Sequence, residues 1–305
     1  MKQRLLLLAL SVSACGPTGQ SADASFDTHV ATPAYRDTHP EVLFDEAHRN
    51  VHTTHTGYGP FAHLLESDGY TITRNRDPFS APARSASVLV IVNASPVDES
   101  TDNSAFTDSE IVAVREWVRS GGSLLLVTDH FPYSGAARRL ATALGATLSR
   151  GMVMDSVHFD STSAIKDESQ LVFSEANGLL GSHAILRGIH RVVSFTGAWV
   201  DGPSDATALL RLSPQAYYLE PSVSVEQRGS DRLTHVNYEN PTSAGGHALA
   251  IAFQFGRGRV VMIAEAGMLT AQKNRDGSKF GMNLPGNDNR QFVLNIIHWL
   301  SHAIP

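Results

Sequence analysis

The sequence predicts an α/β domain with a mainly parallel sheet, helices on both of its faces and a β-hairpin near the C-terminus. Two continuous apolar runs, SVLVIVNAS at 87–95 and SLLLVTDH at 123–130, are typical of strands that are covered on both faces. They alternate with segments of helical period, which favours βαβ units. The chain has 305 residues, 42% of them apolar, which is enough for one large core. Together these features predict a flavodoxin-like arrangement.

The individual elements follow from local signals. A short buried strand is expected at Val42–Phe44, a helix after Pro60 that stops at Gly69, and a strand over TITRNR. Thr107-Asp108-Ser109-Glu110 is a capping-box pattern that opens a helix, which Gly121-Gly122 ends. The later elements are expected as a helix over SGAARRLATALGA, strands at 192–200 and 206–213, a hairpin of HALAIAFQF and RVVMIAEAG about Gly256–Gly258, and a final helix from about Asp288.

The first 39 residues are expected to lie outside the fold. Lys2 and Arg4 precede the apolar run LLLLAL and then VSAC, which predicts a signal peptide over residues 1–14. VSAC resembles a bacterial lipobox, so Cys15, the only cysteine, is predicted to carry lipid. Residues 15–39 are predicted to be a lipidated, flexible tether, and 40–303 a single domain. This predicts a bacterial envelope protein, anchored in the outer membrane and facing the periplasm.

Composition excludes one class of partner. The formal net charge is −6, and no basic run is present, so nucleic acid is not expected as a partner. The predicted partners are the membrane, through lipid on Cys15, and a small polar ligand or an envelope protein.

Polar side chains follow several of the predicted buried strands. In open parallel sheets, ligands bind beyond the carboxyl ends of the strands. The predicted catalytic residues at this edge are Asp45, Glu46, His48, Asp129, His130 and Glu265, and the predicted ligand-binding residues are Asn50, Asn93 and Asn289. A carboxylate beside a histidine can orient it and raise its basicity, so this set predicts acid–base chemistry.

A divalent metal is the alternative use of the same edge. Histidine and carboxylate ligands from separate strands suit zinc, manganese or iron, and the candidate ligands are His48, His52, Asp129 and His130. His48 and His52 are four residues apart, but Gly57, Gly59 and Pro60 indicate a loop rather than a helix there. No G-x-S-x-G elbow is present, which disfavours a serine nucleophile.

Several segments resemble one known superfold. FDEAHRNVHT, WVRSGGSLLLVTDH, HAILRGIHRVVSFTG, GRGRVVMIAEAGMLTAQ and GMNLPGNDNRQFVLNIIHWL are similar to the class I glutamine-amidotransferase-like superfold, over about residues 40–303. More narrowly, they resemble its bacterial lipoprotein members, which are distant kin of gliding-motility and ABC-transport auxiliary domains. The turn where that family has its cysteine nucleophile is Asp129-His130-Phe131 here, so the resemblance implies the fold without glutamine hydrolysis.

Two functions are therefore expected of the sheet edge. The first is hydrolysis, with or without a metal, of a small polar or carbohydrate-like envelope compound. The second is non-catalytic binding of a ligand or partner by an accessory domain. They differ in whether the histidines and carboxylates converge in the fold.

Overall fold

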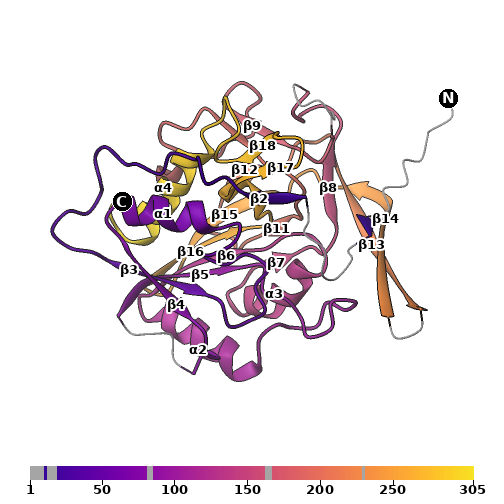
Figure 1. Ribbon diagram of the computed structural model, residues 1–305, viewed down its shortest axis with the longest axis horizontal. Helices are drawn as coiled ribbons and strands as arrows, with labels where there is room; N and C mark the ends of the chain where they lie inside the picture. Colours follow the sequence, from indigo (N-terminus) through magenta and orange to yellow (C-terminus); the bar gives the residue numbers. More distant parts are fainter. Residues whose placement is uncertain (1–9, 12–18, 81–84, 162–166, 229–230) are drawn as a thin grey trace.

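The computed structural model describes residues 10–11, 19–80, 85–161, 167–228 and 231–305. Its largest sheet has nine strands in the order β4-β3-β5-β6-β16-β15-β11-β7, with β12 paired to β15 (Figure 1). The first five strands in this order are parallel neighbours, and the pairings from β16 to β15 onward are antiparallel. The strands are β3 (Glu41–Asp45), β4 (Thr71–Asn75), β5 (Ala86–Val92), β6 (Ser123–Val127), β7 (Thr147–Leu148), β11 (Val200–Asp201), β12 (Thr207–Arg211), β15 (Ala248–Phe255) and β16 (Gly258–Ile263).

The helices cover both faces of this sheet, because its central strands are apolar on both sides. Val88 and Val90 of β5 belong to one core cluster and Leu89 and Ile91 to the other, as the two-residue period of a strand requires. The first cluster contains the apolar sides of α1 (Gly59–Ser67) and α4 (Asn289–Leu300). The second contains those of α2 (Asp108–Arg119) and α3 (Tyr133–Ala143). The predicted capping box at Thr107 and Glu110 is formed.

The predicted fold class was wrong. Strands account for 34% of the structure and helices for 18%, and several sheets are mixed or antiparallel, so the fold is mostly β rather than a flavodoxin-like, mainly parallel α/β fold. Three smaller sheets have the orders β1-β14-β13-β8, β10-β9 and β18-β17-β2. Their strands are β1 (Leu10–Ser11), β2 (Gln20–Ala22), β8 (Met152–Asp155), β9 (Val172–Ser174), β10 (Arg191–Val193), β13 (Ala216–Arg228), β14 (Asp231–Ser243), β17 (Ala271–Asn274) and β18 (Lys279–Gly281).

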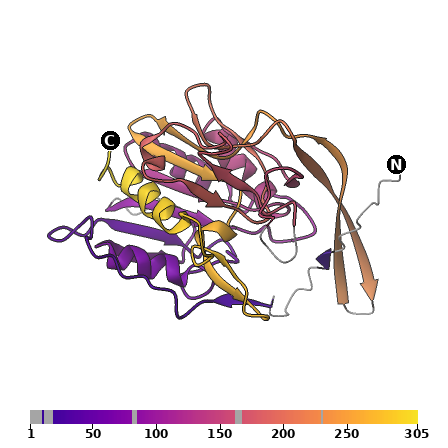
Figure 2. The ribbon, with the colours of Figure 1, turned by 90° about the horizontal axis from the view of Figure 1, so that it is seen from above.

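Two features of these smaller sheets position the site. The strands β13 and β14 form a long hairpin that projects from the body of the molecule (Figure 2). Two short 3-10 helices, η1 (Ala184–Leu186) and η2 (Gly267–Leu269), complete the order of elements, and η2 connects β16 to β17. The hairpin predicted about Gly256–Gly258 is present as β15 and β16.

The segment predicted as a tether is held against the body from residue 20 onward. β2 pairs antiparallel with β17. The buried Asp23 carboxylate lies 2.6 Å from Lys273 Nζ and accepts a hydrogen bond from Asn283. Tyr35 N–H donates to Asp68 O, and a Cβ at Gly69, whose φ is +97°, would lie 2.0 Å from Tyr35 O. Residues within the described part of this segment, 19–39, thus pair and hydrogen-bond with the domain. Cys15 and most of the predicted signal peptide lie outside the described residues, except β1.

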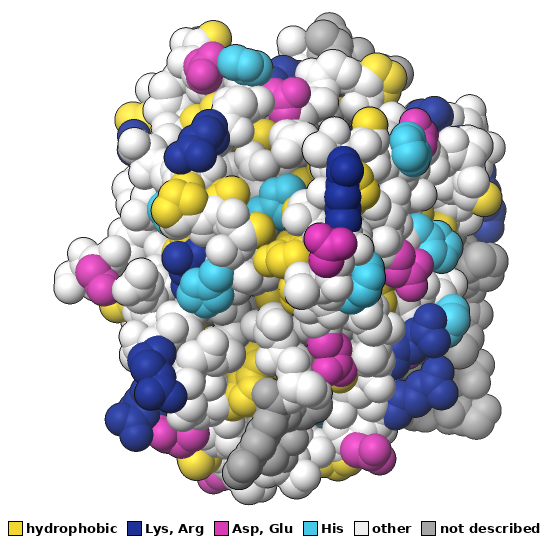
Figure 3. Space-filling model, turned by 90° about the vertical axis from the view of Figure 1, so that its left-hand side faces the viewer, with side chains coloured by type: hydrophobic (Ala, Val, Ile, Leu, Met, Phe, Trp, Pro, Cys, Tyr) yellow, Lys and Arg dark blue, Asp and Glu magenta, His cyan; other side chains and the backbone are white. Residues whose placement is uncertain are grey.

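The surface of the domain carries charged side chains of both signs. On the face shown in Figure 3, lysine and arginine, acidic and histidine side chains are interspersed rather than gathered by sign. No helix among the described residues combines the length and apolar character needed to cross a membrane.

Candidate functional site

The carboxyl ends of β3, β5, β6 and β16 meet at one edge of the nine-stranded sheet, as the sequence predicts for parallel neighbours. The polar residues at this edge separate into two groups. One is centred on His48 and the other on Asp129 and Glu265. Within the described part of the chain, no hydrogen bond or ion pair joins the two groups, so the single shared set expected from the sequence is divided.

The His48 group is a closed structural network. His48 Nδ1 lies 2.9 Å from Asp45 Oδ2, and Nε2 lies 2.9 Å from Glu110 Oε1, a residue of the α2 capping box. The ring packs between Phe79 and Phe106 and is 6% exposed. Burial alone would lower the pKa of His48, but the hydrogen bonds and charges of the two carboxylates raise it. Because both ring nitrogens are engaged, His48 and Asp45 fasten the loop after β3 to α2 and are not available to a substrate.

Three further predicted residues have the same anchoring role. Asn50 Nδ2 donates to Asp45 Oδ2 and to Val92 O. Glu46 accepts hydrogen bonds from the backbone and hydroxyl of Thr54. Asn289 is fully buried and bonds both backbone groups of Val193. Their polar atoms hold loops in place, so the predicted roles of Asn50 and Asn289 in ligand binding and of Glu46 in catalysis are not reflected in their contacts.

The second group contains one buried carboxyl, Glu265, and one half-buried carboxyl, Asp129. Glu265 follows β16 and is 1% exposed, and its two oxygens accept hydrogen bonds from Gly267 N–H at 2.5 Å and Met268 N–H at 2.8 Å. Asp129 follows β6, its side chain is 17% exposed, and Oδ1 accepts from His130 N–H at 2.9 Å. Burial raises the pKa of both carboxyls, and the charge of Asp129 raises that of Glu265 further. Such a pair retains a proton near neutral pH, and its titration belongs to both groups.

Backbone contacts indicate where that proton resides. Both Glu265 oxygens are held by N–H donors, which favours its ionised form. Asp129 receives a backbone hydrogen bond on Oδ1 alone. We therefore place the retained proton on Asp129 Oδ2, with the Glu265 carboxylate behind it.

Tyr58 and Asn93 enclose this pair. Tyr58 is fully buried and donates from Oη to Ala266 O at 2.9 Å, and burial, then Glu265 and Asp129, raise its pKa well above 10.0. Asn93 is 2% exposed, has a φ of 41°, and has no hydrogen-bond partner for Oδ1. A hydrogen bond from Asn93 opposes the rise in the pKa of Asp129. A non-glycine residue at positive φ with an unsatisfied buried oxygen is typical of a functional site.

His130 lies beside Asp129 and is positioned by the projecting hairpin. Its Nδ1 is 2.6 Å from Tyr238 Oη of β14 and 3.1 Å from Phe131 O, while Nε2 is 3.7 Å from Asp129 Oδ1. Because Phe131 O can only accept, we assign the proton to Nδ1, which leaves an acceptor lone pair on Nε2. Burial lowers the pKa of His130 to about 4, so the ring is neutral. The ring is 18% exposed, close to the value for Asp129.

The predicted metal ligands do not gather. His48 is occupied on both nitrogens, and His52 lies over Tyr58 with ring centroids 5.3 Å apart. Burial lowers the pKa of His52 to about 4. Among the described residues, no group of three or more histidine, cysteine or acidic side chains is arranged for a metal. The expected set of His48, His52, Asp129 and His130 is thus not a preformed ligand group, because its members face different networks.

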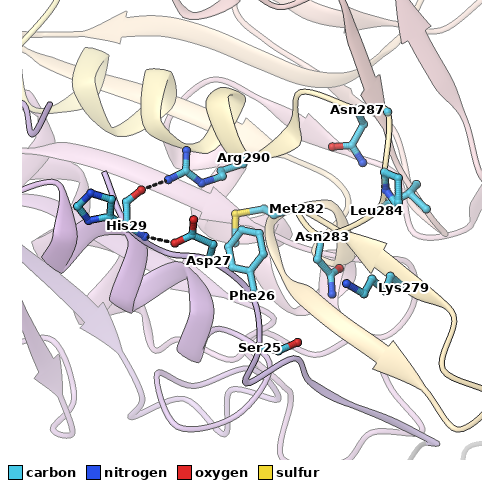
Figure 4. Close-up of a pocket in the computed structure, with 12 residues that line it drawn as sticks. Ser25, Phe26, Asp27, His29, Lys279, Met282, Asn283, Leu284, Asn287 and Arg290 are labelled. Atoms are coloured by element: carbon cyan, nitrogen blue, oxygen red, sulfur yellow. Dashed lines mark hydrogen bonds between the residues drawn. The ribbon is translucent and has the colours of Figure 1, made fainter. Parts of the chain in front are cut away.

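A separate surface pocket of about 560 Å³ lies between the N-terminal segment and the start of α4 (Figure 4). Its walls carry Asp27, Lys279, Asn283 and Arg290, and Arg290 Nη2 donates to His29 O across it. Neither Asp129 nor Glu265 lines this pocket. It therefore belongs to the surface around β18, not to the carboxyl pair.

Sequence reasoning identified part of this arrangement. Asp129, His130, Asn93 and Glu265 were predicted from their places after buried strands. Tyr238 was missed, because β14 lies outside the βαβ part of the chain and offers no local signal for a contact 108 residues away. Tyr58 and Glu110 were also missed, since both resemble ordinary core and capping residues.

Comparisons with solved structures show the fold alone. The mmIFT52 N-terminal domain is 14% identical, with a TM-score of 0.59, over 85% of this chain and 97% of that chain. A putative ThuA-like protein from Bacteroides uniformis ATCC 8492 is 13% identical, with a TM-score of 0.44, over 89% and 93%. A β-galactosidase from Rahnella sp. R3 is 9% identical, with a TM-score of 0.39, over 86% of this chain and 32% of the enzyme. No curated protein sequence matches the chain significantly.

These findings correct the expected family. The predicted class I glutamine-amidotransferase-like fold was wrong, since the structure is mostly β and resembles the mmIFT52 N-terminal domain in fold. A family model described as "Domain of unknown function (DUF4350)" matches residues 50–284, well over half of the chain. The chain belongs to the DUF4350 family.

Proposed function

We propose that this protein is a hydrolase whose acid–base pair is Asp129 and His130. The supporting observation is that two side chains lie side by side at the sheet edge, and burial shifts their pKa values in opposite directions. Asp129 is a carboxyl kept protonated near neutral pH, and His130 is an imidazole kept neutral. Both are partly exposed, while Glu265 behind them is not. Pairs of groups whose environments push their pKa values apart are a mark of acid–base assignments.

The proposed reaction uses each group once. His130 Nε2 takes a proton from a water molecule as the water oxygen bonds to the electrophilic carbon of the substrate. Asp129 Oδ2 gives its proton to the leaving oxygen or nitrogen as the bond to that atom breaks. A proton then passes from His130 to Asp129, which restores both groups. Geometry of this kind contributes roughly 10²–10⁴ in rate for each proton-transfer group.

Glu265 acts in this proposal as a positioning residue rather than a catalytic one. Its carboxylate is sealed from solvent and bonded by two backbone N–H groups, so it cannot touch a substrate. Because it is coupled to Asp129, the titration of the two carboxyls is shared. Tyr238 has a comparable role for His130, because its hydroxyl holds the ring in place.

The charge of the site favours a neutral polar substrate. No lysine or arginine is among the described groups that shift the pKa of Asp129 or Glu265. A phosphate or carboxylate placed here would face the Glu265 carboxylate in a poorly solvated setting, where like charges repel strongly. A small neutral or carbohydrate-like compound meets no such repulsion.

The test is turnover of neutral chromogenic glycosides, esters and amides by the wild type, Asp129→Asn, His130→Asn and His48→Gln. We expect the first two variants to lose at least 100-fold in kcat on any compound that the wild type hydrolyses. His48→Gln should keep kcat once its lower stability is allowed for. Full turnover by Asp129→Asn would refute the proposal.

The second candidate function is ligand binding without catalysis. Its supporting observation is that the same pair is small, largely enclosed and offers one donor and one acceptor. If no compound is turned over, the same panel should still raise the melting temperature of the wild type but not of Asp129→Asn. That result would favour the binding function.

We further propose that the protein is a lipoprotein of the bacterial envelope, anchored through Cys15 to the outer membrane and facing the periplasm. The supporting features are the charged start, the apolar run and VSAC before the only cysteine. Globomycin, which blocks lipoprotein signal cleavage, should cause a slower-migrating precursor to accumulate, and Cys15→Ser should release the protein from the membrane fraction.

A further inference from the structure

We propose that the three-stranded sheet β18-β17-β2 is the surface by which the anchored protein faces the lipid bilayer. We call this surface the β2 face and define it by residues 19–23 and 271–281. The proposal rests on the lipid anchor proposed above and is independent of the acid–base chemistry. Its occupant is the headgroup layer of the membrane that holds the lipid.

The chain between the lipid anchor at Cys15 and the strand β2 is short. From Cys15 to Gln20, the first residue of β2, the chain has five peptide steps, which span at most about 18 Å when fully extended. A domain of this length has a radius of gyration of about 19 Å and is therefore about 50 Å across. Because the link is much shorter than the domain, the domain cannot turn freely to place any of its faces against the membrane. The face that carries the end of the link must stay close to it.

The strand β2 is firmly attached to the rest of the domain. It pairs with β17 through Ala22, Ser21 and Gln20. Immediately after it, the Asp23 carboxylate is fully buried between the side chains of Lys273 and Lys279, at 2.6 and 3.7 Å. The hydrogen bonds with Ser25, Lys273 and Asn283 lower the pKa of Asp23 against the effect of burial, so it remains ionised and paired. The chain is therefore attached to the domain from Gln20 onward.

The charge of the β2 face differs in sign from that of the whole chain. The β2 face carries three basic residues, Lys273, Arg275 and Lys279, against two acidic ones, Asp276 and the buried Asp23 that the two lysines flank, so its own formal charge is positive. The whole chain has a formal net charge of −6. A locally cationic face on an acidic protein complements anionic lipid headgroups, which attract basic side chains near the surface by about 1 kcal/mol each. Lys279 and Arg290 also border the pocket of Figure 4, which opens beside this face.

This orientation has a consequence for the candidate site. β17 begins at Ala271, six residues after Glu265, and η2 is the only element between them. Glu265 and the β17 strand of the β2 face thus belong to one continuous stretch of chain. The site of an anchored molecule would lie on its membrane-proximal side.

The test is depth-dependent quenching of a fluorophore on the full, lipidated chain. Cys15 is the only cysteine, and acylation removes its thiol, so Gln20→Cys or Ser278→Cys gives one labelling site on the β2 face. Both positions are exposed. The control is Val112→Cys on α2, which is 59% exposed and on the opposite face of the main sheet. Each labelled protein is placed in vesicles of phosphatidylethanolamine and phosphatidylglycerol that contain nitroxide-labelled lipid.

We expect labels at 20 and 278 to be quenched at least threefold more than the label at 112. Equal quenching at all three positions, or stronger quenching at 112, would overturn the proposal. Mass spectrometry of the same samples separates the causes. An unmodified Cys15 would overturn the anchor and this inference with it, while leaving the acid–base proposal to its own test.

Discussion

The proton on Asp129 makes a prediction about stability that needs no substrate. The change is Asp129→Asn, which keeps the acceptor for His130 N–H and removes the titrating group. In the folded chain the pKa of Asp129 rises from 3.8 to about 8, chiefly through burial. Between these values the folded state binds more protons than the unfolded state, so the free energy of unfolding falls as pH rises. The variant should lose this dependence.

The magnitude follows from the same shift. One bound proton of difference changes the free energy of unfolding by about 1.4 kcal/mol for each pH unit. From pH 5 to pH 7 the wild type should therefore lose up to roughly 3 kcal/mol through this group, and Asp129→Asn should not. Relative to the wild type, the variant becomes more stable with rising pH.

The assay is urea unfolding of both proteins at pH 5, 6 and 7, with linear extrapolation to water. Asp108→Asn is the control, because that side chain is 79% exposed on α2. We expect the control to follow the wild type at every pH. If the stability difference between the wild type and Asp129→Asn is the same at pH 5 and pH 7, Asp129 is ionised throughout and cannot be the proposed acid.

Four other changes test the remaining assignments. His48→Gln should destabilise the protein by about 3–5 kcal/mol in urea unfolding, because two buried carboxylates lose their shared partner; the contribution of His48 is full below pH 6.5 and is lost as pH rises through its raised pKa. Tyr238→Phe should cost about 1 kcal/mol and change the ring-nitrogen NMR shifts of His130, because Nδ1 loses one hydrogen-bond partner, and unchanged shifts would contradict the positioning role. Asn93→Gly should stabilise the fold by about 1 kcal/mol by removing the positive-φ cost, and should move the alkaline limb of activity to higher pH, because a hydrogen bond that lowers the pKa of Asp129 is lost. Asp23→Asn should speed proteolytic cleavage within residues 19–39, whereas an unchanged rate would show that the Lys273 pair does not hold β2.

The parts of the fold that sequence could predict are those with a strong local period. β5 and β6 appear as unbroken apolar runs because both faces are covered, and the start of α2 is marked by a capping box. The hairpin of β13 and β14 has no such signal. Its outer residues alternate weakly between half-buried and exposed, and Pro221 and Pro241 interrupt the pattern. The prediction therefore gave too much weight to the parallel core and missed the strands that make the structure mostly β.

The candidate site shows a similar division. Asp129 and Glu265 could be placed at one edge because parallel strands bring their ends together. Tyr238 could not, because its contact with His130 depends on how a distant hairpin folds back. His48 was assigned to the site because it is close in sequence to Asp45 and His52. The structure instead satisfies both of its nitrogens within a loop anchor, and only the three-dimensional contacts reveal that difference.

The contrast between His48 and His130 explains why the site is placed where it is. Both are histidines beside carboxyls at the same sheet edge. His48 lies between the carboxyl groups of Asp45 and Glu110, which raise its pKa, so both of its nitrogens are satisfied and its ring is buried. His130 lies between a tyrosine and the carboxyl of Asp129, burial lowers its pKa to about 4, and Nε2 remains an acceptor at the surface. A structural histidine has both ring nitrogens hydrogen-bonded to protein groups, whereas a histidine that can act on a substrate keeps one ring nitrogen available. By that criterion His130, and not His48, is the base of this edge.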